Sequence, residues 1–254
     1  MPADRAAVLR VKKGNENMII GAILAGGTGT RMNLSSMPKQ FLPLGDKPIL
    51  IHTVARYLMN KRIDAVILGV HADWVEYTHE LLEQYLPEEK SRVKVITGGA
   101  DRTDTMLRLL SAIEEEYGVS DEHIVLTHDG VRPFVTQRMI DENIEAVYEY
   151  GAVNTVSPAI DTIVVSEDGK TISNVPDRTT MFLGQCPQTF RVSQLKSVYN
   201  SLTEEERKTL TEATKIYMMR GLPVYLVQGA VSNIKITTPA DYKMAQAIAE
   251  DFQD

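Results

Sequence analysis

Short apolar runs alternate with amphipathic segments along most of this chain of 254 residues. The runs, typical of buried parallel strands, occur at 19–24, 65–70, 93–97 and 124–127. Apolar residues at helical spacing occur at 49–60, 73–85 and 105–117. This alternation predicts an α/β fold with right-handed crossovers and a mostly parallel sheet that helices cover on both faces.

Three of the predicted strands end in turns of small or polar residues, which begin at Ala25, Gly98 and Asp129. Ligands of open parallel sheets bind at the carboxyl ends of the strands. We therefore expect the three turns to meet at one site. This convergence is the main reason, from the pattern alone, to predict an enzyme.

The pattern changes at residue 153. Two β-rich segments, 153–165 and 171–175, flank Glu-Asp-Gly at 167–169, a favourable hairpin turn. We interpret about 153–180 as a protruding β-arm, and exposed strands of this kind commonly pair with a second copy. The remaining chain predicts helices at 192–202, 204–219 and 239–252, a strand at 224–228 and a β-run at 233–237.

Composition narrows the class of protein. The net charge of −7 and the pI near 5.4 argue against a general nucleic-acid-binding protein, which would carry an excess of basic residues. No apolar run approaches the roughly 20 residues of a membrane span. The single cysteine, Cys186, has no internal partner for a disulfide, which fits a reducing cytoplasm and a role as a small apolar filler. We expect 1–17 to be a loose N-terminal extension and 18–254 to be a single domain.

The stretch from Met18 to Gln40 has the features of a polyphosphate cradle. A predicted strand runs into Ala-Gly-Gly-Thr-Gly-Thr at 25–30, where small residues allow close backbone approach, and the cations Arg31 and Lys39 follow. Two familiar phosphate loops are disfavoured. Met32 replaces the third glycine of G-x-G-x-x-G, which argues against a dinucleotide oxidoreductase, and the Walker motif is absent.

Other candidate residues leave alternatives open. Asp129 is either a turn former or a Mg²⁺ ligand, because Mg²⁺ prefers one or two carboxylates together with phosphate oxygens. Lys235 lies between two isoleucines and either faces water or points at the end of the sheet. Arg178 suits phosphate capture but is equally compatible with a surface charge. For His128 we favour a structural role.

Six motifs occur in an order that resembles one family of nucleotidyltransferases. They are LAGGTGTRM at 24–32, PKQF at 38–41, GGADRTDT at 98–105, HDGVRP at 128–133, PDR at 176–178 and NIKITTPADY at 233–242. They resemble the cytidylyltransferases that act on methylerythritol phosphate and on ribitol 5-phosphate, over essentially all of the chain from Met18. The resemblance implies a three-layer α/β sandwich with a mixed, mostly parallel twisted sheet, a β-arm that clasps a second subunit, and CTP with Mg²⁺.

The resemblance also implies roles for individual residues. Those implied for catalysis are Arg31, Lys39 and Lys235. Those implied for the nucleotide are Leu24, Ala25, Gly26, Gly27, Gly99, Arg102, Thr105 and Asp129, the last also holding the metal. Those implied for the acceptor are Asp161, Arg178, Gln185 and Thr211, with Arg178 gripping the acceptor phosphate across a homodimer.

The arm distinguishes the two branches of this family. Methylerythritol enzymes usually carry an arginine before the Asp-Thr of the arm, where this chain has Ile160. FLGQCPQT at 182–189 resembles the Y-x-G-Q-T-P-Q-T of the ribitol-phosphate branch, whereas Glu212 replaces an aspartate expected in either branch. The resemblance favours transfer to ribitol 5-phosphate for a wall polymer of the teichoic-acid type, with a link to the reductase that makes this acceptor. Transfer to methylerythritol phosphate, for isoprenoids, and a non-catalytic nucleotide sensor are the alternatives.

Overall fold

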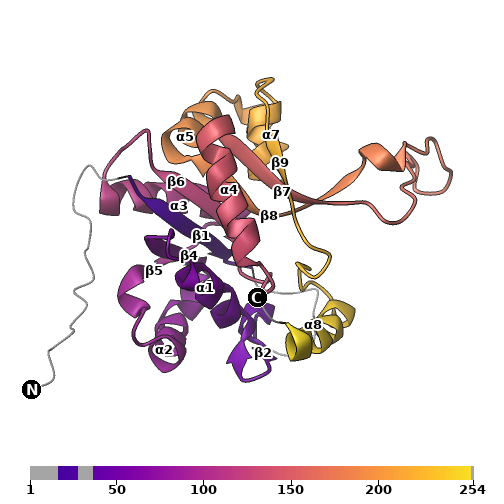
Figure 1. Cartoon of the computed structure of the whole chain (residues 1–254). Helices are drawn as coiled ribbons and strands as arrows, with labels where there is room; N and C mark the ends of the chain where they lie inside the picture. The colour runs from indigo at the N-terminus through magenta and orange to yellow at the C-terminus, as the bar shows by residue number, and fades with distance from the viewer. Residues whose placement is uncertain (1–16, 28–36, 253–254) are drawn as a thin grey trace, which may run out of the picture.

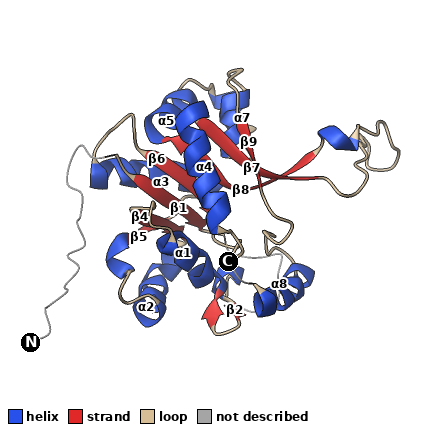
Figure 2. Ribbon diagram, viewed as in Figure 1, coloured by secondary structure: helices blue, strands red, loops and turns tan. Residues whose placement is uncertain are grey.

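The structure is a computed structural model that describes residues 17–27 and 37–252 (Figure 1). The predicted extension at 1–17 therefore lies almost wholly outside the described residues, and so does Arg31. The described chain forms a body built on one sheet, from which a single arm projects (Figure 2).

The sheet has seven strands in the order β5-β4-β1-β6-β8-β7-β9 within the described residues. They are β1 (Ile19–Ala25), β4 (Ala65–Val70), β5 (Val93–Thr97), β6 (Ile124–Asp129), β7 (Ala152–Pro158), β8 (Phe182–Arg191) and β9 (Tyr225–Gln228). The first four are mutually parallel, β8 is antiparallel to both β6 and β7, and β9 is parallel to β7. The predicted mixed, mostly parallel sheet is confirmed.

Helices cover both faces of the sheet, as predicted. The helices α1 (Ile49–Met59), α2 (Val75–Tyr85) and α4 (Gln137–Tyr150) pack on one face. The helices α3 (Arg102–Tyr117), α5 (Val192–Asn200) and α7 (Ala213–Met218) pack on the other. Alternate residues of β1 serve the two cores, Ile23 on the first side and Ile20 on the second, because strand side chains alternate between faces.

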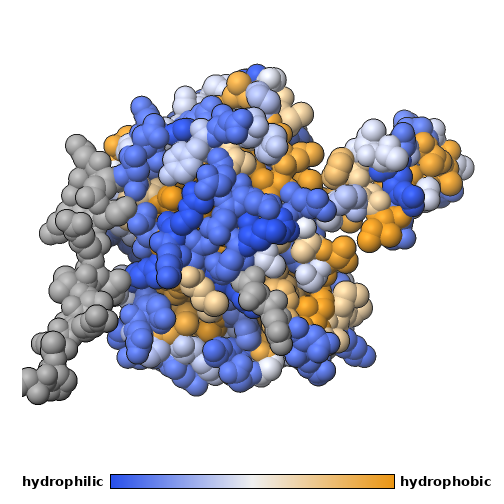
Figure 3. Space-filling view, viewed as in Figure 1, coloured by the Kyte–Doolittle hydropathy of each residue, from blue (hydrophilic) through white to orange (hydrophobic). Residues whose placement is uncertain are grey.

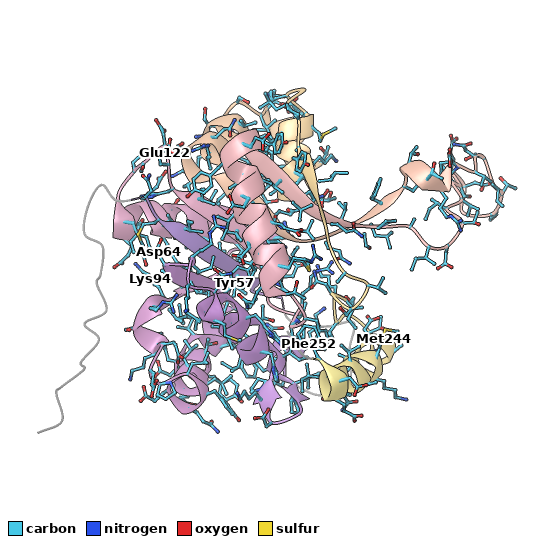
Figure 4. All side chains as sticks on the ribbon, in the orientation of Figure 1. Tyr57, Asp64, Lys94, Glu122, Met244 and Phe252 are labelled. Atoms are coloured by element: carbon cyan, nitrogen blue, oxygen red, sulfur yellow. The ribbon has the colours of Figure 1, made fainter. Side chains whose placement is uncertain are left out.

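A third, smaller core holds the C-terminal helix α8 (Pro239–Asp251) against the hairpin of β2 (Pro43–Leu44) and β3 (Lys47–Pro48). Phe252, labelled in Figure 4, follows α8 directly. Its ring lies edge-on to that of Phe134, with ring centroids 5.1 Å apart. Ile236 is fully buried in this core. The segment between β9 and α8 is thereby held close to the end of β6.

The arm departs from its predicted form. Between β7 and β8 the chain makes one isolated bridge, Val165 with Asn174, so a strand over 171–175 is not formed and that prediction was wrong. The turn itself is present, because the Asp168 carboxylate accepts hydrogen bonds from the N–H groups of Lys170 and Thr171 at 2.8 Å. The arm residues have no core to cover, and this explains the lack of a longer ladder.

Two other elements also differ from prediction. The expected helix at 204–219 is two helices, α6 (Glu204–Lys208) and α7, separated by non-helical residues 209–212. The helix α6 buries none of its residues, whereas α7 buries Ile216 and Tyr217. The expected β-run at 233–237 pairs with no strand of the described chain, although Ile236 donates its N–H to the Val131 carbonyl at 3.0 Å.

Short 3-10 helices occur at Lys39–Phe41, Ala72–Trp74, Lys90–Arg92 and Arg178–Thr180. Among residues 17–27 and 37–252, no helix has both the length and the apolar character needed to cross a membrane.

Candidate active site

The three predicted turns meet at one cavity of about 410 Å³ at the carboxyl ends of β1, β5 and β6. The residues that line it are Leu24, Ala25, Gly26, Gly27, Lys39, Gln40, Gly99, Ala100, Asp101, Arg102, Thr105, Asp129, Val131 and Lys235. All the residues predicted to hold a nucleotide are among them, together with Lys39 and Lys235 of the predicted catalytic set. Arg31 lies outside the described residues.

The first turn is held by hydrogen bonds from Gln40, a residue outside the turn. The Gln40 side-chain amide donates to the Ala25 carbonyl at 2.7 Å and to the Gly27 carbonyl at 2.8 Å. Because Gln40 follows Lys39 in the same 3-10 helix, this contact also holds Lys39 beside the turn. The cavity therefore has glycine backbone and a lysine on the same wall.

The second turn is built by the first turn of α3. Asp101 caps the helix by accepting from the Asp104 N–H at 2.8 Å, and the Thr105 hydroxyl accepts from the Gly99 N–H at 2.9 Å. A Cβ at Gly99 would collide with the Asp104 carboxyl group, so only glycine fits. The helix starts three residues earlier than predicted, which places Arg102 in its first turn.

The third turn brings three cations around one buried carboxylate. Asp129 Oδ2 lies 2.9 Å from Lys235 Nζ and 3.5 Å from Arg132 Nε, and Oδ1 lies 3.6 Å from Arg102 Nε. Burial alone would raise the pKa of Asp129, but the cations, Arg102 and Lys235 foremost, hold that pKa well below its usual range. Asp129 is therefore ionised at neutral pH and fixes the positions of the cations around it.

The position of Lys235 depends on anchors on both sides of it. Arg132 Nη1 donates to the Asn233 carbonyl at 2.8 Å, and Asp241, in the capping box of α8, accepts from the Thr237 and Thr238 N–H groups at 3.0 and 2.7 Å. These hydrogen bonds hold residues 233–238 in place although they form no strand. Lys235 thus points at the site, one of the two readings left open by its flanking isoleucines.

Two reactive residue types next to the site are inert. His128 is fully buried, its Nε2 lies 3.0 Å from the Arg132 carbonyl, and burial lowers its pKa to about 4. Burial raises the pKa of the Cys186 thiol. Both groups are uncharged at neutral pH, in agreement with the structural roles expected for them.

The four residues predicted for the acceptor are not part of this cavity. Asp161 and Arg178 are exposed on the arm, where Arg178 Nη1 donates to the Ile160 carbonyl at 2.8 Å. Gln185 is buried and donates to the Ala230 carbonyl at 2.9 Å. Thr211 lines a second cavity of about 410 Å³, which shares Asp101 and Arg102 with the first.

Two site residues were missed by reasoning from the sequence. Arg132 stands in the HDGVRP motif but had no assigned role, and the structure shows it buried between Asp129 and Asn233. Gln40 belongs to the PKQF motif but had no assigned role, and its contact with the β1 turn has no sequence signal beyond adjacency to Lys39. Both contacts depend on parts of the chain that only the fold brings together.

The site combines glycine turns, fixed cations and one ionised carboxylate at the carboxyl ends of parallel strands. This combination suits a nucleoside triphosphate, and together with the three-layer fold it defines a nucleotidyltransferase. The family model for IspD, 2-C-methyl-D-erythritol 4-phosphate cytidylyltransferase, matches residues 19–251. The chain belongs to this family of cytidylyltransferases.

Individual relatives agree with this assignment. Ribitol-5-phosphate cytidylyltransferase from Streptococcus pneumoniae serotype 19F (strain G54) is 46% identical over 233 residues, covering 92% of this chain and 99% of that protein. The structure is similar to 4-diphosphocytidyl-2C-methyl-D-erythritol synthase from Anaerococcus prevotii, with a TM-score of 0.76, 26% identity and coverage of 92% and 96%. The enzyme titled 2-C-methyl-D-erythritol 4-phosphate cytidylyltransferase from Thermus thermophilus gives a TM-score of 0.68 at 27% identity, with coverage of 92% and 100%.

Proposed function

We propose that this chain transfers the cytidylyl group of CTP to D-ribitol 5-phosphate, forming CDP-ribitol and releasing pyrophosphate. The observation that carries the proposal is the 46% identity to ribitol-5-phosphate cytidylyltransferase along nearly the full length of both chains. CDP-ribitol would be made in the cytoplasm and used to build a wall polymer of the teichoic-acid type. A reductase that makes ribitol 5-phosphate would then be the functional partner.

The reaction needs little covalent chemistry from the protein. A phosphate oxygen of the acceptor attacks the α-phosphorus of CTP, and the bond from that phosphorus to the oxygen bridging to the β-phosphate breaks. The electron pair leaves with pyrophosphate. The acceptor phosphate is already anionic, so no general base is required, which suits a neutral, buried His128. Lys39, Arg102 and Lys235 offset the negative charge that develops on the leaving oxygens.

Mg²⁺ is the proposed cofactor, and Asp129 would hold it in exchange for its contact with Lys235, whose Nζ lies 2.9 Å from Oδ2. No group of three His, Cys, Asp or Glu residues suited to a metal occurs within the described part of the chain. Mg²⁺ bound together with a nucleotide needs only one or two carboxylates, and Asp129 is ionised at the cavity wall. When bound, the ion would neutralise phosphate charge. EDTA is expected to abolish turnover, and added Mg²⁺ to restore it.

A homodimer formed through the arm is proposed to complete the acceptor side. Apolar side chains gather on the arm (Figure 3), and Ile160, Ile172 and Val175 are 66%, 64% and 55% exposed in the single chain. Such a projecting apolar surface is typical of a protein–protein contact. In a dimer, Arg178 of one copy would reach the acceptor phosphate held by the other.

Transfer to 2-C-methyl-D-erythritol 4-phosphate is the second candidate. It is favoured by the description of the family model and by the names of the similar solved structures. Ile160 argues against it, because a neutral side chain stands where the methylerythritol branch usually has an arginine.

Pyrophosphate release with CTP and Mg²⁺ tests the proposal, with the two acceptors offered in parallel. Turnover with ribitol 5-phosphate alone is expected. Preference for methylerythritol phosphate would contradict the proposed acceptor while keeping the family chemistry. Tight CTP binding without turnover on either acceptor would instead favour a non-catalytic nucleotide sensor. The variant Lys235→Met serves as the inactive control in each assay.

A further inference from the structure

Gln40 is a buried polar residue to which the sequence assigned no role. Its side chain is only 2% exposed, and its Nε2 bonds both the Ala25 and Gly27 carbonyls. A side-chain amide nitrogen carries two hydrogens, so the two bonds use both of its donors. Gln40 therefore joins two peptide groups of one turn, at 2.7 and 2.8 Å, from a separate segment of chain.

These two bonds orient the backbone of the turn. In a planar trans peptide the carbonyl and the N–H point in opposite directions. With the Ala25 carbonyl drawn to Gln40, the N–H of Gly26 is turned away from Gln40. Oriented backbone N–H groups in a glycine turn are a recurrent way to bind phosphate oxygens. Without Gln40 the two glycines would be free to rotate these peptide groups, because glycine has few backbone constraints.

The segment that carries Gln40 is itself anchored. The next residue, Phe41, is buried and stacks on Trp74 with ring centroids 5.0 Å apart and planes 26° apart. Tyr77 packs edge-on to the Phe41 ring at 5.4 Å. Gln40 is therefore held from the side of α2. Trp74 is also the one tryptophan of the chain, so its fluorescence reports on this segment without labelling.

We propose that Gln40 is a positioning residue for the nucleotide: it holds residues 25–27, the described part of the turn after β1, in the conformation that binds the phosphates of CTP. This inference rests on the proposed use of CTP but not on the identity of the acceptor. Gln40 acts through the peptide groups of the turn. Its loss should therefore weaken binding of the nucleotide and leave the later chemical step nearly intact.

The test measures CTP binding in Mg²⁺ buffer, without acceptor, by Trp74 fluorescence and by calorimetry. Gln40→Glu removes both donors and places a carboxylate against two carbonyls. Gln40→Met removes them without adding charge. Loss of two hydrogen bonds at the turn predicts CTP affinity weaker by about tenfold to a hundredfold in each variant. With acceptor present, KM for CTP should rise by the same factor while kcat stays within about threefold.

Asn143→Asp is the matched control for a purely structural effect. Asn143 is also a buried amide, and its Nδ2 donates to the Met139 carbonyl and to the Thr155 hydroxyl, both at 2.8 Å, from α4. It lines neither cavity described above. This variant should lose thermal stability and keep the CTP affinity of the parent.

Three outcomes would overturn the inference. The first is unchanged CTP affinity in folded Gln40→Met. The second is an equal loss of affinity in Asn143→Asp, which would make the effect one of general stability. The third is failure of both Gln40 variants to fold even in the cold, because Gln40 would then be chiefly structural. Weak CTP binding by the parent chain itself, with tight binding of another nucleotide, would instead contradict the proposed function.

Discussion

Lys235 and Asp129 form a direct ion pair, with Nζ 2.9 Å from Oδ2, although one residue ends β6 and the other precedes α8. Their side chains are 39% and 10% exposed, so the lysine faces the cavity while the carboxylate lies beneath it. The pair holds a cation in place before any nucleotide arrives. An incoming phosphate group would then find the ammonium already positioned, which is the arrangement expected of electrostatic catalysis.

Replacement of this lysine is the first prediction. Lys235→Met should lower turnover about 10²–10³-fold, the typical cost of removing one preorganised donor. The melting temperature should change little, because Arg102 and Arg132 continue to neutralise Asp129. Steady-state kinetics and thermal unfolding measure both effects. Lys243→Met, at an exposed position on α8, is the control, and near-normal turnover of Lys235→Met would refute the assigned role.

The buried His128 predicts a pH dependence of stability. Burial lowers its pKa to about 4 in the folded chain, from an ordinary value of 6.5. Between these values the unfolded chain binds more protons, so stability is fully present above about pH 6.5 and declines as the pH falls towards 4. A shift of this size corresponds to roughly 3 kcal/mol.

Denaturant unfolding from pH 7.5 to 4.5 measures this loss. His128→Gln does not titrate, so its stability should fall by less over that range than that of the parent chain. His79→Gln, at an exposed position on α2, should follow the parent. Identical pH profiles for the parent and His128→Gln would show that this histidine carries no proton linkage.

Gly27 and Gly99 should respond differently to alanine. No described atom lies within 4 Å of a Cβ built at Gly27, so Gly27→Ala should fold normally. It should lose affinity for CTP, because the added methyl group would meet the phosphates that approach the backbone there. An overpacking clash of about 1–3 kcal/mol there predicts a KM for CTP raised about fivefold to a hundredfold. Gly99→Ala collides with Asp104 and should lower stability as well. An unchanged KM for CTP in Gly27→Ala would place the phosphates elsewhere.

The arm arginine provides a test of the acceptor site. Arg178→Ala should raise KM for the acceptor about tenfold to a hundredfold, the loss expected for a charged hydrogen bond, and leave KM for CTP unchanged. Lys170→Ala, also exposed on the arm, should alter neither constant. The Arg178→Ala and Lys235→Met proteins can also be mixed. If Arg178 serves the site of the other copy, a mixed dimer has one site with both side chains intact and regains part of the activity. Absence of any regain would argue against sharing of residues between copies.

The sequence by itself determined the alternation of strands and helices and the meeting of three turns at one cavity. Both follow from local properties, because apolar periodicity reports which face of an element is buried and parallel strands end at one edge of a sheet. The eight residues that the family resemblance assigned to the nucleotide all line that cavity.

Tertiary structure alone decided the contacts between distant segments. Examples are the hydrogen bonds from Gln40 to the β1 turn, the ion pairs of Asp129 and the hydrogen bond from Arg132 to Asn233 beside Lys235. Each joins segments whose proximity cannot be read from the periodicity of the sequence. The absence of a strand over 171–175 and the break between α6 and α7 were also not predicted, because tertiary context overrides local propensity.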